Sequence, residues 1–267
     1  MQTEKISEIA TIGKGMTLEQ IGINMALQEP SNKWIDQKTI LAGPPKVGKS
    51  TFLAQAGNKA YFIRMAREFN NIATYGANAR DYDELKKEIE KLHKVHQSRL
   101  WGTEQFPIET LVIDPGDKLL QFISDKVCED AKADSIYEAG GYGVGQNKYK
   151  RILKSFLTDI EHLPAHKFFC FHTKNQELSE PNNESRKYHR WILDVSEKLD
   201  SEFPKRVDNT LNIMVGYAGT MQSRIMIIQG TKYIEAGAKA PCLKKMTQIP
   251  WSTDDKDNYT KFRALFT

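Results

Sequence analysis

Short apolar runs alternate with longer amphipathic stretches along most of the chain. Four runs have the length and composition of buried strands: residues 39–42, 59–64, 111–114 and 168–171. Three stretches carry apolar residues at helical spacing: residues 81–98, 118–132 and 148–163. Strands that alternate with helices predict an α/β domain, in which helices cover both faces of a mostly parallel sheet. Two later apolar runs, residues 211–217 and 224–229, are expected to extend this sheet.

The same pattern divides the chain into three parts: an N-terminal arm at 1–37, an α/β core at 38–250 and a C-terminal tail at 251–267. The arm contains a helical stretch around residues 18–27, which ends before Pro30. The tail ends with the apolar residues Phe262, Leu265 and Phe266. We expect them to dock on the core of the same chain, with a neighbouring subunit as the alternative.

The composition is that of an ordinary globular protein. Of the 267 residues, 40% are hydrophobic and 27% are charged, which excludes disorder along the whole chain. The three cysteines have no metal-ligand spacing, which favours reduced thiols. Because no run of about 18 apolar residues and no secretion signal is present, we expect a soluble cytoplasmic protein without a membrane partner. The net charge of +4 permits nucleic-acid binding without requiring it.

The most specific motif follows the first predicted strand. It matches the phosphate-binding pattern G-x-x-x-x-G-K-[ST], in which backbone N–H groups and a helix N-terminus point at phosphate oxygens. The expected nucleotide-binding residues are Gly43, Pro44, Pro45, Lys46, Val47, Gly48, Lys49, Ser50 and Thr51. Lys49 is expected to reach the β- and γ-phosphates during catalysis, and Ser50 to bind Mg²⁺. The sequence therefore predicts that the chain binds a nucleoside triphosphate.

A second candidate metal ligand ends the predicted strand at residues 111–114. P-loop proteins hold Mg²⁺ between the Ser or Thr of the loop and an aspartate at the end of a buried strand. Asp114 is therefore expected to bind the metal opposite Ser50. Since many strands end in aspartate, this prediction depends on the loop that precedes it.

His172 is a candidate for sensing the γ-phosphate. It follows the predicted strand at 168–171, and parallel α/β sheets bind ligands at the carboxyl ends of their strands. The alternative is a histidine that only caps or hydrogen-bonds the end of a strand. Four other histidines lack a ligand partner at metal spacing and are expected to be solvated: His93, His96, His162 and His166.

The segment after His172 is polar, and its cations are interleaved with aromatic residues. Residues 175–190 are expected to form a loop. Single-stranded nucleic acid is bound by cations that contact phosphates and by rings that stack on bases. The candidate DNA-binding residues are Lys174, Arg186, Lys187, Tyr188 and Arg190. From composition alone, an ordinary solvated loop is an equal alternative.

Together these segments resemble a known family. The resemblance is carried by residues 43–50, residues 111–114, the glycine-rich segment 140–145, the sequence His172-Thr173-Lys174 and the run that begins at Arg224. Their succession is similar to that of phage-encoded RecA-like ATPases, which are core-only recombinases grouped with single-strand annealing proteins. The resemblance covers residues 38–245 and implies a RecA-like P-loop NTPase core with ATP and Mg²⁺ as ligands.

The resemblance also implies partners. It implies that the loops at 140–145 and 175–190 bind single-stranded DNA in phage recombination or replication, in the host cytoplasm. It further implies neighbouring subunits that share nucleotide sites in a ring or filament. Lys239 is the candidate for reaching a neighbour's γ-phosphate. A single-stranded-DNA-binding or replication protein is another candidate partner.

One position departs from the family's pattern. RecA-like enzymes place a catalytic glutamate just after the second strand, where this chain has Ile63-Arg64-Met65-Ala66-Arg67-Glu68. Glu68 is the candidate catalytic base, although it comes later than the pattern requires. The other common position, directly after Asp114, is occupied by Pro115. Without a positioned base, hydrolysis loses the group that orients the nucleophile, so slow hydrolysis or binding without turnover is the alternative.

Two classes of function follow from these observations. The first is an ATPase that assembles on single-stranded DNA and promotes pairing or annealing. The second is a nucleotide-dependent regulatory or loader protein, which acts on another protein with little or no turnover. A small-molecule kinase is a third class, disfavoured because the chain has no arginine-rich lid segment.

Overall fold

The computed structural model describes residues 11–12, 16–17, 30–65, 72–180, 183–200, 202–218, 221–251 and 256–266. The chain divides into two compact units, residues 1–30 and residues 31–267. In the first unit, β1 (Thr11–Ile12) pairs with β2 (Met16–Thr17) in antiparallel orientation. The helix predicted around residues 18–27 and the candidate base Glu68 lie outside the described residues. The predicted three-part division of the chain stays a prediction.

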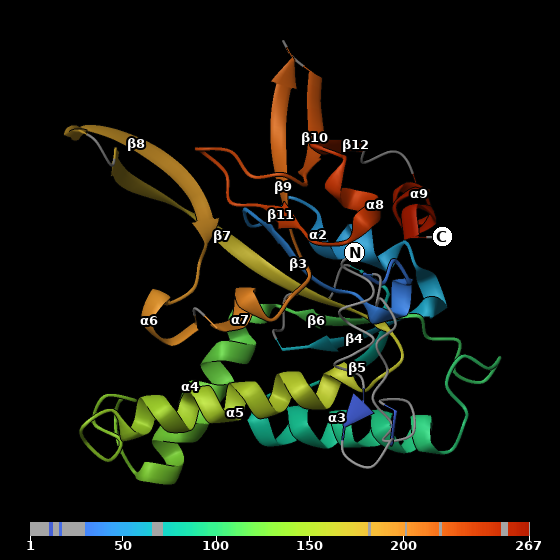
Figure 1. The fold of residues 1–267 in the computed structure, drawn as a ribbon, viewed down its shortest axis with the longest axis vertical. Helices are drawn as coiled ribbons and strands as arrows, with labels where there is room; N and C mark the ends of the chain where they lie inside the picture. The colour runs from blue at the N-terminus through green and yellow to red at the C-terminus, as the bar shows by residue number, and fades with distance from the viewer. Residues whose placement is uncertain are drawn as a thin grey trace. The chain divides into compact units, whose positions relative to one another are not determined.

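A sheet of ten strands forms the centre of the second unit (Figure 1). Six of them are parallel, in the order β5 (Tyr75–Asn78), β4 (Ala60–Arg64), β6 (Thr110–Asp114), β7 (His166–Glu180), β3 (Lys38–Gly43) and β9 (Asn209–Ala218). The antiparallel strands are β10 (Met221–Ile227), β12 (Gln248–Trp251), β11 (Gly237–Ala238) and β8 (Asn183–Leu193). The predicted α/β fold, with C-terminal strands that extend a mostly parallel sheet, is confirmed.

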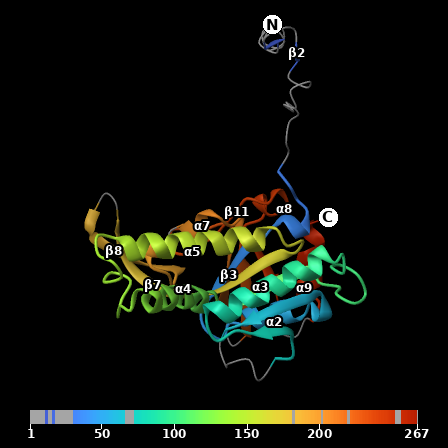
Figure 2. The ribbon, with the colours of Figure 1, turned by 90° about the horizontal axis from the view of Figure 1, so that it is seen from below.

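Helices cover both faces of this sheet (Figure 1). One face carries α3 (Tyr82–Gln97), α4 (Gly116–Ala131) and α5 (Val144–Glu161), which Figure 2 shows side by side. The other face carries α2 (Lys49–Ala54), α8 (Pro241–Lys244) and α9 (Asn258–Arg263). The short helices are η1 (Trp34–Asp36), η2 (Gly57–Lys59), α6 (Glu197–Asp200), α7 (Glu202–Lys205) and η4 (Ala264–Phe266).

Successive strand residues pack into two separate cores, one on each face. In β3, Ile40 contributes to the core under α3, α4 and α5, whereas Leu41 contributes to the core under α2. In β7, Phe169 contributes to the core under α3, α4 and α5, and Phe168 contributes to the core under α2. Side chains along a strand point to alternate faces, so a strand that is buried on both faces needs a continuous apolar run. This explains why the central strands are recognisable in the sequence.

The C-terminal tail packs on its own chain, as predicted. Phe262 and Phe266 are 2% and 3% exposed and belong to the core under α2. Their rings lie around the indole of Trp34, with ring centroids 6.1 and 5.1 Å from it. Trp34 is itself 2% exposed, although the sequence pattern assigns it to the N-terminal arm.

The segment at 175–190 is not a loop, and this prediction is wrong. β7 continues to Glu180 and pairs with β8, so the two strands form a hairpin that extends beyond the helices (Figure 1). The sequence predicts a loop here because its many Asn, Glu, Lys and Ser residues have low strand propensity. Backbone hydrogen bonds between the strands and contacts between side chains of the two strands stabilise the hairpin. In one such contact, the Lys187 ammonium donates to Glu177 at 2.6 Å.

Two further predictions need correction. His166 is not solvated, because it begins β7 and is fully buried, sharing a hydrogen bond of 2.7 Å with Thr39 and stacking on Phe168. Burial holds the pKa of His166 well below its usual value. The glycine-rich segment at 140–145 is also shorter as a loop than predicted, since α5 begins at Val144.

Candidate nucleotide-binding site

The phosphate-binding loop connects β3 to α2 at the carboxyl edge of the sheet. Gly48 has a φ of +100° at the start of α2, a backbone angle that strongly favours glycine. A Cβ on Gly48 would also lie 3.2 Å from the indole of Trp251. A Cβ on Gly43 would lie 2.7 Å from the backbone oxygen of Ile213. Gly43 is therefore favoured by the close approach of β9, and Gly48 by its backbone angle together with the contact to β12.

The Lys49 side chain lies buried against the loop. Its ammonium donates to the backbone oxygens of Gly43 and Pro44 at 2.9 and 3.1 Å, and the residue is 7% exposed. Burial lowers the pKa of Lys49, and the nearby charges of Asp114 and Asp117 oppose this shift. Two carbonyl oxygens accept hydrogen bonds from the ammonium, and phosphate oxygens are stronger partners for the same group.

The side chains of Ser50 and Asp114, the two predicted metal ligands, are in direct contact, and their binding of a metal stays a prediction. The Ser50 hydroxyl donates to Oδ2 of Asp114 at 2.6 Å, and Asp114 is 4% exposed. Burial raises the pKa of Asp114 to about 6, while the Ser50 hydrogen bond and the charge of Lys49 act in the opposite direction. A hydroxyl and a carboxylate fit Mg²⁺ that takes its other ligands from phosphates and water. Among the described residues, no group of three His, Cys, Asp or Glu side chains could hold a metal alone.

His172 lies beside the loop and is held by Asp117. In the pairing of β3 with β7, His172 is the partner of Gly43. Its ring nitrogen Nδ1 is hydrogen-bonded to Oδ2 of Asp117, and its backbone N–H donates to Oδ1 at 3.3 Å. Asp117 lies in the first turn of α4. The preceding Gly116 lets α4 approach β7, since a Cβ there would lie 2.5 Å from the Phe171 ring.

Asp117 is a site residue that the sequence pattern does not identify. The signal that could have found it is an acid in the first turn of the helix directly after the Asp114 strand. At this position a carboxylate faces the same edge of the sheet as the residues that end the neighbouring strands. The structure thus brings Lys49, Ser50, Asp114 and His172 together and adds Asp117 to them.

The candidate DNA-binding residues lie on the hairpin of β7 and β8 rather than in the nucleotide site. Lys174 forms an ion pair with Asp194 at 3.1 Å. Tyr188 packs against Tyr233, and the Lys232 ammonium lies 4.5 Å from its ring centroid. The remaining three candidates are Arg186, Lys187 and Arg190, all on β8.

Lys239 lies at the other edge of the sheet. It follows β11, which pairs with the first residues of β9, whereas the phosphate-binding loop follows the end of β3. Its ammonium donates to the backbone oxygen of Val207 at 2.9 Å. Lys239 is therefore remote from the loop of its own chain, and its role toward a neighbouring subunit stays a prediction.

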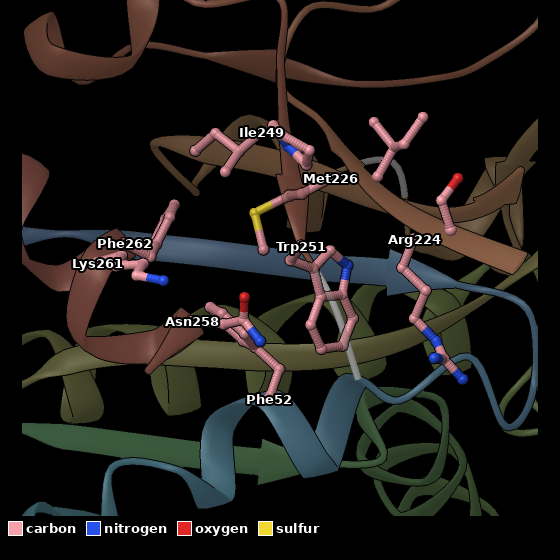
Figure 3. A pocket seen from close by; sticks show the side chains of 11 residues that line it. Phe52, Arg224, Met226, Ile249, Trp251, Asn258, Lys261 and Phe262 are labelled. Atoms are coloured by element: carbon pink, nitrogen blue, oxygen red, sulfur yellow. The ribbon is translucent and has the colours of Figure 1, made fainter. Parts of the chain in front are cut away.

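A pocket of about 390 Å³ adjoins the outer side of α2 (Figure 3). The Arg224 side chain of β10 donates from Nε to the backbone oxygen of Val47 at 2.8 Å, and its guanidinium lies 5.8 Å from the centroid of the Trp251 ring. The Trp251 ring in turn contacts Phe52 of α2 edge to face, with centroids 5.6 Å apart. Arg224 thus supports the loop from outside. Its spacing in the sequence gives no sign of this contact, because it depends on how β10 pairs with β9.

Comparison with known proteins places the chain in a family. A protein-family model described as an AAA domain (AAA_24) matches residues 35–239, and the chain belongs to this family. No curated protein matches the sequence. Among solved structures, a KaiC-like protein from the hyperthermophilic archaeon Pyrococcus horikoshii is similar, with 12% identity and a TM-score of 0.41 over 81% of this chain and 85% of that one.

The family and the loop together define an ATPase domain of the P-loop class, with nucleotide as the expected ligand. In the part of the chain that the structure describes, no helix is both long enough and apolar enough to cross a membrane.

Proposed function

We propose that this protein binds ATP with Mg²⁺ at residues 43–51 and hydrolyses it while acting on single-stranded DNA, in phage recombination or replication. The observation that carries the nucleotide part is the 2.6 Å hydrogen bond between Ser50 and Asp114 beside the buried Lys49. In P-loop ATPases these groups bind the metal and the phosphates. Ser50 and Asp114 would hold the Mg²⁺, which would supply positive charge to offset the negative charge that develops during phosphoryl transfer.

The DNA part of the proposal is supported by the hairpin of β7 and β8. β7 passes His172, beside the loop, and continues directly into the hairpin. The β8 strand carries Arg186, Lys187 and Arg190 together with the ring of Tyr188. These are the kinds of side chain that contact phosphates and stack on bases in single-strand binding sites.

A cation that already forms an ion pair within the chain is less available to DNA. Lys187 is paired with Glu177 at 2.6 Å. Arg186 is exposed, and among the described residues it has no ion pair. We therefore expect Arg186 to contribute more to DNA binding than Lys187, because DNA must first displace the carboxylate from Lys187.

Variants that change the hairpin charge in opposite directions test this part. Arg186→Ala should weaken binding of a fluorescent single-stranded oligonucleotide and reduce the salt slope of log K by about 0.7 for each phosphate that is no longer neutralised. Glu177→Gln frees Lys187 and should strengthen binding. Lys94→Ala, which removes a charge from α3, is the control for net charge. Unchanged affinity and salt slope in both hairpin variants would contradict DNA binding by the hairpin.

Self-association into a ring or filament belongs to the same proposal, with Lys239 contacting a neighbour's nucleotide. It is supported by the resemblance alone. Sedimentation of the full chain with and without ATP and single-stranded DNA tests it, and a monomer under all conditions would contradict it.

A second function is favoured because the sequence has no acidic residue directly after β4, the usual position of the catalytic base. In this alternative the protein is a nucleotide-dependent regulator or loader that acts on another protein with little turnover. ATP turnover with and without single-stranded DNA distinguishes the two, with Lys49→Ala as the blank. Stimulation by DNA supports the first function, whereas ATP binding without turnover under either condition supports the second.

A further inference from the structure

We propose that Asp117 and His172 act as a pair that positions the water attacking the γ-phosphate and accepts its proton. This inference rests on the proposed ATP hydrolysis. It assigns to the pair the role that RecA-like enzymes give to a glutamate after the second strand. In the sequence, the candidate for that role is Glu68, which comes later than the pattern requires. The pair in the structure comes from different elements, the first turn of α4 and the end of the part of β7 that pairs with β3.

The interaction between the two residues fixes the histidine in orientation and in tautomer. The Asp117 carboxylate binds the His172 backbone N–H through Oδ1, at 3.3 Å, and ring nitrogen Nδ1 through Oδ2. A carboxylate accepts hydrogen bonds, so Nδ1 of the neutral ring carries the hydrogen and Nε2 carries the free lone pair. Within the described residues Nε2 has no hydrogen-bond partner. The ring therefore has one basic atom available for a water molecule.

The pair lies beside the groups that would hold the phosphates. His172 is the strand partner of Gly43, whose backbone oxygen binds the Lys49 ammonium. Both side chains are partly open to solvent, with exposed fractions of 33% for His172 and 27% for Asp117. A water molecule can therefore reach the ring, which a fully buried histidine such as His166 would not permit.

The step that this geometry supports is an in-line displacement. The water oxygen forms a bond to the γ-phosphorus while one of its protons passes to Nε2 of His172. The bond between the γ-phosphorus and the bridging oxygen breaks, and its electron pair stays with ADP. The charge of Asp117 stabilises the imidazolium until it returns the proton to solvent. His172 is thus the catalytic residue, and Asp117 is a positioning residue that acts through it.

The test measures kcat, ATP affinity and thermal stability in two variants of the full chain. His172→Ala and Asp117→Asn should each lower kcat by roughly 10²-fold or more, the usual contribution of general base catalysis. The dissociation constant of a fluorescent ATP analogue should stay within about twofold of wild type, because the pair acts on the attacking water. The double variant should be no slower than the slower single variant, since the two residues act as one unit.

Rescue by added imidazole distinguishes a catalytic role of His172 from a merely structural one. It should restore part of the turnover of His172→Ala and none of the turnover of Lys49→Ala. Asp125→Asn, an exposed acid on the same helix, and His162→Ala, an exposed histidine after α5, are the matched controls and should behave as wild type.

The outcomes separate this inference from the proposed function. Wild-type protein that binds ATP without turning it over would overturn both. Turnover that survives in His172→Ala and Asp117→Asn would overturn the pair and leave the ATPase standing. Equal losses of ATP binding and turnover, or a lack of recovery with imidazole, would also contradict proton transfer to His172.

Discussion

Replacing Asp114 by asparagine should make the nucleotide-free protein more stable while removing its response to Mg²⁺. Asp114 is 4% exposed, and burial raises its pKa from an ordinary value of 3.8 to about 6. The folded state therefore binds the proton more tightly than the unfolded chain does. The contribution of Asp114 to stability then decreases as pH rises from 3.8 to 6, and above pH 6 the full penalty remains.

The size of the effect follows from the same two values. Each pKa unit corresponds to about 1.4 kcal/mol, so the raised pKa of Asp114 destabilises the fold by about 3 kcal/mol at neutral pH. Asparagine keeps the shape and can still accept the hydrogen bond from Ser50, but it carries no charge. Asp114→Asn should therefore be more stable than wild type by up to about 3 kcal/mol at about pH 7.5, and the difference should shrink at about pH 4.5.

Urea unfolding at the two pH values, with EDTA and without nucleotide, measures this difference. In a second series, Mg²⁺ and ATP should raise the stability of wild type in proportion to the logarithm of ligand concentration, and that of the variant much less. An asparagine variant that is less stable than wild type at the higher pH would refute the argument from burial. A variant that responds to Mg²⁺ and ATP as wild type does would refute the metal assignment.

Three further outcomes are expected. Arg224→Ala removes the hydrogen bond to Val47, worth about 1.5–3 kcal/mol for a charged donor, and should weaken ATP binding measured by fluorescence titration. Gly116→Ala forces a methyl group against the Phe171 ring and should lower the urea midpoint by the equivalent of about 1–3 kcal/mol. Because the folded pKa of His166 lies well below its unfolded value, the contribution of His166 to stability should fall as pH drops below about 6.5, and His166→Gln should remove this contribution in urea titrations.

The central sheet and the loop could be predicted because each depends on local sequence. Strands such as β3 and β6 are buried on both faces, so nearly every position is apolar and the run is visible without knowledge of its neighbours. The phosphate-binding motif is contiguous, and its glycines and Lys49 act within a single turn. The meeting of Ser50 with Asp114 follows from the rule that parallel strands present their carboxyl ends at one edge.

The remaining features depend on interactions between distant segments. Most residues of the β7–β8 hairpin are polar, and its pairing is maintained by backbone hydrogen bonds that leave no regular apolar pattern in the sequence. Asp117 reaches His172 only because α4 packs against β7. Arg224 reaches Val47 across 177 positions of sequence, an interaction that no local spacing could indicate.

The β7 strand gives the molecule a mechanical property. From His172 to Glu180 it extends for eight residues beyond the nucleotide loop, which at about 3.3 Å per residue makes an arm of roughly 26 Å. Because its pairing with β8 makes this part of β7 resist bending, a tilt at its base is transmitted along its length. A tilt of about 5° near His172 would displace the hairpin tip by about 2 Å, enough to break a hydrogen bond made at the tip. The hairpin is thus a stiff arm whose base lies beside the phosphate-binding loop, where His172 pairs with Gly43.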